Sequence, residues 1–212
     1  SCGKKLRRIL QTSVLEAVYT KPKGKTKAGA FVVGCGLGKK ARYLKSYWKR
    51  KKPMVVDGDA LNYLANHPKL LKKSPSSTVL TPHPLEMARL LGIPVSAVES
   101  DRIGIARYAA ERFSSVVVLK GRHTVIASPG GSVWINRGGN SALAKGGSGD
   151  VLAGFLGGLL ASGYSAEEAS VIAVYAHSRA AEILTAGRPE EGVLPSEIIS
   201  LLDNAFFLRQ NL

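Results

Sequence analysis

The sequence predicts an α/β fold in which helices cover both faces of a mostly parallel central sheet. Strand-like and helix-like segments alternate along the 212 residues, which is the pattern of such layered folds. The run Ser115 to Leu119 is rich in valine, as expected for a strand that is buried on both faces. With 45% hydrophobic residues the chain can bury a sizeable core, which excludes a disordered or low-complexity protein.

The first half of the chain is expected to hold three strands, each followed by a helical segment. The strands are predicted over Ala30 to Val33, Met54 to Val56 and Thr78 to Leu80. The helical segments are a basic stretch to about Arg50, a helix through Leu61 and Leu64, and a helix over Leu85 to Leu91. Pro84 suits the first turn of this last helix, and Gly92 suits its end.

The second half is expected to add a long helix, a strand, a hairpin and three further helices. Ser96 to Phe113 has the spacing of one amphipathic helix, and the strand Ser115 to Leu119 follows it. Turn residues at Pro129-Gly130-Gly131 predict a β-hairpin at the edge of the sheet, over Thr124 to Ala127 and Ser132 to Ile135. The last helices are predicted from the glycines at 146–149 to Ala161, from a capping box at Ser165 to about Leu184, and over Pro195 to Phe207. Because no repeat or linker is visible, we expect a single domain over residues 1–212.

The net charge of +15 is concentrated in the first third of the chain. Residues 1–73 hold 19 of the 30 Lys and Arg residues and three of the 15 Asp and Glu residues. Such a block could attract phosphate-bearing ligands or nucleic acid, or it could be a solvated basic face that aids solubility.

Cysteine and histidine usage predicts a protein of a reducing compartment, which we take to be the cytoplasm. The two cysteines, Cys2 and Cys35, are too few for a disulfide framework or a zinc site. The four histidines have no metal-ligand spacing, so no metal-binding residues are assigned. Apolar runs such as Val151 to Ala161 are shorter than the roughly 20 residues that span a bilayer, and no membrane partner is expected.

The strongest local signal is the glycine-rich segment Gly146-Gly147-Ser148-Gly149-Asp150 ahead of an apolar helix. Unpaired N–H groups at a helix N-terminus favour an anion such as phosphate. A carboxylate beside that anion, here Asp150, could accept a proton from an attacking hydroxyl. Asp150 could also be an ordinary acidic residue of a first helical turn. Since Lys145 precedes the glycines, a Walker A loop is disfavoured.

Weaker signals lie where other strands end, as expected for ligand sites of open α/β sheets. The loop Gly34 to Gly38 could let backbone approach a ligand or could serve tight packing. His83, between two prolines, could contact a ligand or cap a helix. Asp57 and Asp59 could bind Mg²⁺ through water, although capping of the next helix is favoured. The turn Lys120 to Thr124 could bind a nucleotide phosphate or be a simple basic turn.

Taken in order, these segments resemble the NAD(P)H-hydrate dehydratase family, of the YjeF C-terminal domain type, within the ribokinase-like superfamily. The resemblance covers roughly Ala30 to Leu202. Five ordered segments carry it: Val33-Gly34-Cys35-Gly36-Leu37-Gly38, Val55-Val56-Asp57-Gly58-Asp59-Ala60-Leu61-Asn62, Thr81-Pro82-His83-Pro84-Leu85-Glu86-Met87, the turn Lys120 to Thr124, and Gly139-Asn140 through Gly154.

The resemblance implies a ribokinase-like three-layer fold and a lyase that repairs hydrated NADH or NADPH with ATP or ADP, in the presence of Mg²⁺. The nucleotide would phosphorylate the hydroxyl of the hydrate, and loss of phosphate would restore the nicotinamide double bond. By motif position Asp150 would be the catalytic base, and the N–H groups of Gly147, Ser148 and Gly149 would stabilise the transferring phosphoryl group. Gly36, His83 and Asp150 would bind the hydrated dinucleotide. The adenine nucleotide would bind at Lys120, Gly121, Arg122, His123, Thr124 and Gly149.

The chain departs from the family pattern in two places. Cys35 stands where the family usually has Pro. Family domains also carry a strand, a glycine-rich loop and a helix before the region that matches Ser1 to Thr20, and we expect this unit to be lacking here. The activity of such a shortened chain is left open.

Two other functions are weighed against the dehydratase. The first is an ATP-dependent kinase of the same superfamily that acts on a sugar or vitamin hydroxyl, although the segment Thr81 to Glu86 favours the dehydratase. The second is a nucleic-acid-binding protein that uses the basic first third, which is disfavoured because no nucleic-acid motif is visible. The choice between ATP and ADP, the choice between NADH and NADPH hydrates, and assembly into a homo-oligomer are left open.

Overall fold

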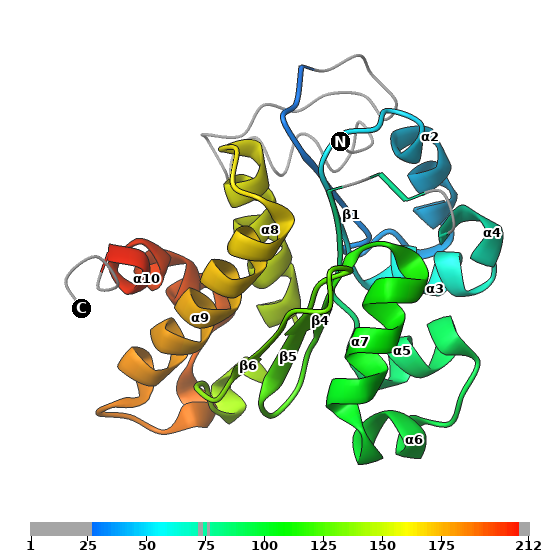
Figure 1. Ribbon diagram of the computed structural model, residues 1–212. Coiled ribbons are helices and arrows are strands. Elements are labelled where there is room, and N and C mark those ends of the chain that lie inside the picture. Colours follow the sequence, from blue (N-terminus) through cyan, green and yellow to red (C-terminus); the bar gives the residue numbers. More distant parts are fainter. Residues whose placement is uncertain (1–26, 72–73, 76, 208–212) are drawn as a thin grey trace.

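The computed structural model describes residues 27–71, 74–75 and 77–207, and in this part of the chain a six-stranded sheet forms the centre (Figure 1). The strands lie side by side in chain order. The first four pair in parallel, and the last two join them antiparallel. Their bounds are β1 Phe31–Val33, β2 Met54–Val56, β3 Thr78–Leu80, β4 Val116–Leu119, β5 Thr124–Ala127 and β6 Val133–Asn136. The predicted mostly parallel sheet with an edge hairpin is therefore confirmed.

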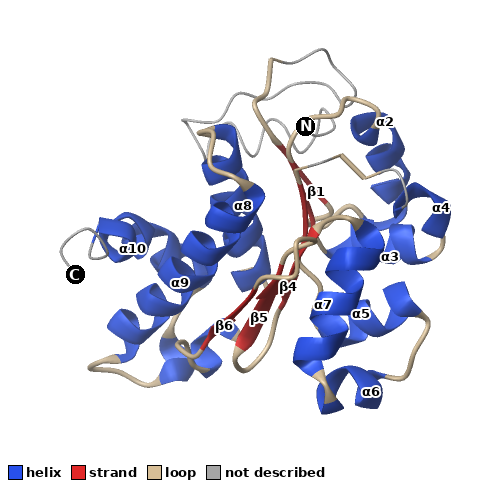
Figure 2. Ribbon diagram, in the orientation of Figure 1, coloured by secondary structure: helices blue, strands red, loops and turns tan. Residues whose placement is uncertain are grey.

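Helices cover both faces of the sheet and make three layers (Figure 2). One core cluster joins one face of the strands to helices of the first half of the chain, and a second joins the other face to two later helices. The helices of the first layer are α2 Leu44–Trp48, α3 Gly58–Ala65, α4 Pro68–Leu71, α5 Pro84–Leu91, α6 Val95–Ser100 and α7 Arg102–Phe113. Those of the other layer are α8 Ser148–Ala161 and α9 Ala166–Thr185, against which α10 Pro195–Phe207 packs.

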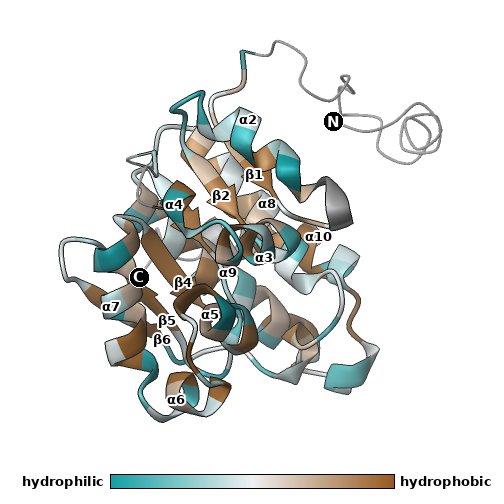
Figure 3. Ribbon diagram, turned by 90° about the vertical axis from the view of Figure 1, so that its right-hand side faces the viewer, coloured by the Kyte–Doolittle hydropathy of each residue, from teal (hydrophilic) through white to brown (hydrophobic). Residues whose placement is uncertain are grey.

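Hydropathy explains this layering. The β2 strand is buried at every position, as is β4, and both are among the most hydrophobic elements in Figure 3. A strand that is apolar on both faces needs helices on both sides of the sheet, because a face left in water would expose apolar area. Residues alternate along each strand, so that Val55 contributes to one core cluster while its neighbours Met54 and Val56 contribute to the other.

The prediction of one helix over Ser96 to Phe113 is wrong. The helix is interrupted at Asp101, whose backbone angles of φ −142° and ψ 69° are not helical. The Asp101 carboxylate accepts a hydrogen bond from the N–H of Gly104 at 2.8 Å, which is an N-cap interaction that begins α7. The apolar spacing continues through the break because both helices turn an apolar side to the same core.

The basic stretch after β1 is also not one regular helix. It begins with a 3₁₀ helix, η1, over Gly38–Tyr43 and continues as α2 over Leu44–Trp48. Its residue Ala41 is buried, and 3₁₀ turns are frequent before an α-helix and as connectors. Of the basic block, residues 1–26, which include Cys2, and residues 72–73 lie outside the described residues.

The other predicted elements agree with the structure to within a few residues, whereas the short helix α4 was not predicted. The hairpin of β5 and β6 forms one edge of the sheet, with Val125 paired to Ile135. The capping box at Ser165 begins α9. Helix α5 begins at Pro84 and is closed by Gly92, the residue after its end, whose φ is +71°. Among the described residues, none of the helices combines the length and the apolar character that a membrane crossing requires.

Candidate active site

A cavity of about 630 Å³ lies where the carboxyl end of β4, the loop after β6 and the beginning of α8 meet. The predicted nucleotide-binding residues line it together, although the turn after β4 and the beginning of α8 are distant in the sequence. A cavity of this volume is typical of small-molecule sites. Its lining residues include Lys120, Gly121, Arg122, His123, Thr124, Arg137, Asn140, Ser148, Gly149 and His177.

The first turn of α8 forms one wall of this cavity. Gly147, with a φ of +94°, turns the chain into the helix, a backbone conformation that glycine adopts without strain. The N–H of Ser148 donates to the carbonyl of Lys145 at 3.2 Å, so of the three predicted amides this one is already used. The N–H groups of Gly147 and Gly149 donate to no other residue in the described part of the chain, which leaves them available at the positive end of the helix dipole.

The Lys145 side chain holds this glycine turn in place. Its ammonium donates to the carbonyl of Glu190 at 3.3 Å and to that of Val193 at 2.8 Å, and also to the carbonyl of Glu191. These acceptors belong to the segment around a short 3₁₀ helix, η3 Glu190–Gly192, just before α10. Lys145 directly precedes the glycines in the sequence. Its role in holding the turn depends on the segment around η3, which lies more than 40 residues further along the chain.

The carboxylate of Asp57, at the carboxyl end of β2, is buried with 4% of the residue exposed. Its Oδ1 accepts a hydrogen bond from Thr81 Oγ1 at 2.6 Å and lies 2.6 Å from Nζ of Lys120. The favoured prediction that Asp57 and Asp59 cap the next helix is wrong. Asp57 stands at the N-cap position of α3 without a capping hydrogen bond, and Asp59 Oδ2 instead accepts from the N–H of Gly38 at 2.6 Å.

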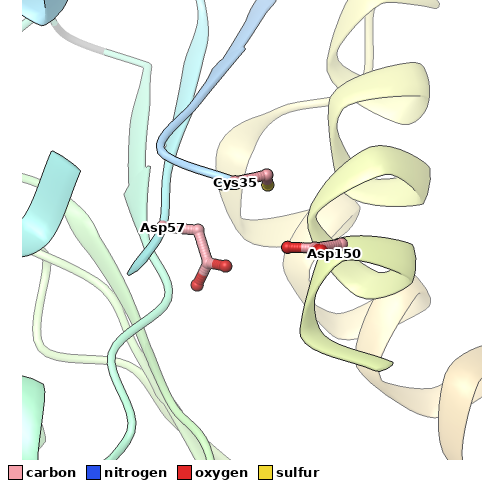
Figure 4. Close-up of side chains that lie close together, drawn as sticks. All are labelled: Cys35, Asp57 and Asp150. Atoms are coloured by element: carbon pink, nitrogen blue, oxygen red, sulfur yellow. The ribbon is translucent and has the colours of Figure 1, made fainter. Parts of the chain in front are cut away.

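The thiol of Cys35 and the carboxylate of Asp150 lie close to the carboxylate of Asp57 (Figure 4). One side-chain atom each of Cys35, Asp57 and Asp150 lies within 4.8 Å of the others, although the sequence offered no metal-ligand spacing. Burial, together with the nearby negative charges of Asp150 and Asp57, raises the pKa of the Cys35 thiol to about 12. The thiol is therefore protonated at neutral pH. Asp150 is exposed, on the first turn of α8.

The glycines of the loop after β1 have different roles. A Cβ on Gly34 would lie 1.6 Å from the carbonyl oxygen of Asp57, so Gly34 serves close packing between neighbouring strand ends. A Cβ on Gly36 or Gly38 would meet nothing within 4 Å. Gly36 is exposed, so the space in front of it is open to a ligand. The packing interpretation therefore holds for Gly34, and the interpretation that the loop approaches a ligand stays a prediction for Gly36.

His83 caps a helix. Its Nδ1 accepts from the N–H of Glu86 at 3.3 Å, and its own N–H donates to Glu86 Oε2 at 2.8 Å, which makes a reciprocal capping box at the start of α5. The imidazole remains 46% exposed, so the cap leaves part of the ring accessible. The preceding residue, Pro82, accepts a hydrogen bond from the N–H of Lys120 at 2.9 Å, which places this loop beside the cavity.

His177 is a residue of the cavity that the sequence did not single out. It belongs to α9, is 6% exposed and lies with its Nε2 3.2 Å from Ser148 Oγ. Burial lowers the pKa of its imidazole to about 4, so the ring is neutral at neutral pH. The sequence gives no sign that His177 lines the cavity, because its position there depends on the packing of α9 against α8.

The predicted site residues thus fall into two neighbouring groups. Lys120, Gly121, Arg122, His123, Thr124, Ser148 and Gly149 line the cavity. Asp150 lies beside Cys35, the neighbour of Gly36, and beside Asp57, which pairs with Lys120. Gly147 belongs to the turn that joins the groups, and His83 stands at the cap next to Pro82.

Comparison with known proteins shows that the chain is similar to members of one enzyme family. The NAD(P)H-hydrate dehydratase family, Carb_kinase, matches residues 7–204. The chain is 44% identical over 170 residues to the bifunctional NAD(P)H-hydrate repair enzyme Nnr of Mycobacterium leprae, covering 79% of this chain and 35% of that protein. The chain spans 35% of the length of this relative and 55% of the length of a second curated relative.

Solved structures agree in fold. An ADP/ATP-dependent NAD(P)H-hydrate dehydratase from Bacillus subtilis, co-crystallised with ATP and Mg²⁺, is 29% identical with a TM-score of 0.85, covering 97% of this chain and 76% of that one. A ribokinase-like superfamily protein from Enterococcus faecalis is 27% identical with a TM-score of 0.75, covering 96% and 68%. The predicted ribokinase-like three-layer fold is confirmed, and the chain belongs to the NAD(P)H-hydrate dehydratase family.

Proposed function

We propose that this chain dehydrates hydrated NADH or NADPH at the expense of ATP or ADP. One observation carries the proposal. The basic turn after β4 and the amides that begin α8 line the same cavity, while the carboxylate of Asp150 lies on the same first turn beside it. A phosphate held by these amides would be next to a proton acceptor, which is the arrangement that phosphoryl transfer to a hydroxyl requires.

The cavity side takes the adenine nucleotide. Lys120, Gly121, Arg122, His123 and Thr124 supply cations, a hydroxyl and backbone N–H groups. The Gly149 amide, which lines the cavity, supplies an anion site at a helix N-terminus together with the amide of the N-cap residue Gly147. The Bacillus subtilis enzyme of the same family was co-crystallised with ATP and Mg²⁺, which supports a nucleotide here.

The side of Asp150 takes the hydrated dinucleotide. Gly36 is exposed with open space above it, His83 keeps part of its ring accessible, and Asp150 is exposed. In this arrangement Asp150 accepts the proton of the hydrate hydroxyl as the oxygen attacks the terminal phosphorus of the nucleotide. The bond between the terminal phosphorus and the bridging oxygen breaks, and ADP leaves, or AMP when ADP is used. The amides of α8 stabilise the charge on the transferred phosphoryl group.

The phosphorylated hydrate then loses its phosphate. The bond between carbon and the phosphate oxygen breaks, a proton leaves the neighbouring carbon, and the nicotinamide double bond is restored. The balance is one hydrate and one ATP to one reduced dinucleotide, ADP and phosphate, or AMP and phosphate when ADP is used.

Mg²⁺ fits the donor atoms near the transferred phosphate in part. The carboxylates of Asp57 and Asp150 offer oxygen ligands within 4.8 Å of each other, whereas the Cys35 thiol is not a magnesium ligand. Asp57 and Asp150 would hold the ion, through water or together with the nucleotide phosphates. When bound, Mg²⁺ neutralises phosphate charge.

A spectrophotometric assay tests the proposal. The chain is incubated with hydrated NADH or NADPH and with ATP, ADP or no nucleotide, and recovery of the nicotinamide absorbance is followed. We expect recovery that depends on the nucleotide. Consumption of ATP without recovered NADH would contradict the dehydratase, and turnover on sugar or vitamin hydroxyls would favour the related kinase.

Other expectations stay predictions. A single domain predicts one cooperative unfolding transition, and the state of assembly is measured by sedimentation. Nucleic acid is not expected as a partner, and an affinity for DNA that falls steeply with salt would contradict this. A cytoplasmic location is checked by cell fractionation.

A further inference from the structure

Three neighbouring parallel strands each contribute one side chain to a single polar network. Asp57 follows β2, Thr81 follows β3 and Lys120 follows β4. The Asp57 Oδ1 atom lies 2.6 Å from Thr81 Oγ1 and 2.6 Å from Lys120 Nζ. The network is largely shielded from water, because the side chains of Asp57 and Lys120 are 6% and 21% exposed.

The ammonium in this network also faces the beginning of α8. A Cβ built on Gly149 would lie 3.5 Å from Lys120 Nζ and 3.9 Å from Asp57 Oδ2. The N–H of Gly149 donates to no other described residue. A fixed cation and a free amide are therefore close together at one wall of the cavity, where both would meet the same anion.

Stability does not account for this pair. A buried ion pair contributes little to stability compared with apolar side chains of the same volume, because both charges lose their hydration. Asp57 also stands at the N-cap position of α3, where a carboxylate normally binds the helix amides, yet it makes no such bond. Its carboxylate is directed to Lys120 instead of to its own helix.

We infer that Asp57 is a positioning residue that, together with Thr81, holds the Lys120 ammonium at the N-terminus of α8 to meet the nucleotide phosphates. The inference rests on the proposed function. The Lys120 backbone is anchored as well, since its N–H donates to the Pro82 carbonyl at 2.9 Å. A lysine side chain loses much rotamer entropy when it is fixed, and here that cost is met before the ligand arrives, which favours binding.

The test separates phosphate recognition from binding of the base and sugar. Dissociation constants of adenosine, AMP, ADP and ATP are measured by calorimetry for the wild type, Asp57→Asn, Thr81→Val and Lys120→Met. Mg²⁺ is left out, so that the loss of a magnesium ligand does not contribute. For Asp57→Asn we expect about a 10- to 100-fold loss for ADP and ATP, which is the effect of one charge-assisted hydrogen bond. Adenosine should bind as it does to the wild type. Asp101→Asn, an exposed change at the start of α7, is the matched control and should leave all four constants unchanged.

A double-mutant cycle shows whether Asp57 acts through Lys120. The double variant Asp57→Asn/Lys120→Met should bind ATP no more weakly than Lys120→Met, because the two residues serve one contact. Additive losses would overturn the inference, as would an equal loss for adenosine and ATP or no loss in Asp57→Asn. If Asp57→Asn does not fold, the same comparison of ATP with adenosine is made with Thr81→Val, for which we expect a smaller loss for ATP alone. Wild-type protein that binds neither ADP nor ATP would instead refute the proposed function, and the inference with it.

Discussion

The imidazole of His177 on α9 lies 3.2 Å from the hydroxyl of Ser148, the first residue of α8, and both side chains are buried. This contact joins two helices directly behind the glycine turn, at the wall of the cavity. Because burial lowers the pKa of His177 to about 4, the contact is made by a neutral ring over most of the pH range.

The first prediction is a loss of stability in weak acid. The unfolded chain binds a proton at His177 near the ordinary pKa of about 6.5, whereas the folded chain binds it only near 4. Stability contributed by the neutral ring is thus present above pH 6.5 and is lost as the pH falls toward 4. Urea unfolding should show that the wild type loses about 2 kcal/mol more than His177→Gln between pH 7 and pH 5. Equal losses in the two proteins would contradict the prediction.

The second prediction concerns Asp150. Asp150→Asn keeps the shape of the side chain on the first turn of α8 but removes the proton acceptor, so turnover should fall by about a hundred- to ten-thousandfold. Binding of ATP or ADP in the cavity, measured without Mg²⁺, should remain, because Asp150 does not line the cavity. Absorbance recovery and calorimetry measure the two quantities separately. Near-normal turnover would exclude Asp150 as the base.

The third prediction is that the Cys35 thiol reacts slowly with alkylating agents. With a pKa raised to about 12 by burial and by Asp150 and Asp57, the thiol of the folded chain is almost entirely protonated, and the thiolate is the reactive form. At mildly alkaline pH the rate should be roughly a thousandfold below that of the urea-unfolded chain. Peptide mapping by mass spectrometry after timed iodoacetamide treatment reads this site directly. Rapid labelling of folded protein would mean that the thiolate forms easily.

The fourth prediction compares two glycines of one loop. Gly34→Ala should destabilise the fold by about 4 kcal/mol or more, because its Cβ would lie 1.6 Å from the Asp57 carbonyl oxygen. Gly36→Ala should cost only about 1 to 2 kcal/mol for its positive φ, since its Cβ would meet nothing within 4 Å. Gly36→Ala should nevertheless weaken binding of the hydrated dinucleotide. Thermal unfolding measures the first difference, and substrate titration tests the second.

Much of the fold could be predicted because its signals are local. The apolar runs of β2, β3 and β5 were predicted with their observed ends, since a strand buried on both faces has few polar residues to blur its limits. The break at Asp101 could not be predicted from apolar spacing, because α6 and α7 face the same core on either side of it. The same is true of the basic stretch that forms η1 and α2.

The site was predictable where one segment carries the whole signal. The glycine turn before α8 and the turn after β4 are of this kind. The pair of Asp57 and Lys120 is not, because these residues are 63 positions apart and meet only through the order of β2, β3 and β4. The contact of His177 with Ser148 likewise depends on how α9 packs against α8, which no periodicity of either helix specifies.

The hydrogen bonds of Lys145 couple the glycine turn before α8 to a distant part of the chain. Its ammonium binds carbonyls 45 and 48 positions further along, at Glu190 and Val193. The glycine turn itself has little intrinsic stiffness, since glycine leaves the backbone many conformations. Its shape is therefore imposed from outside, by the segment that leads into α10. Any partner, ligand or substitution that moves this segment would reshape the amides in front of Asp150 without touching them.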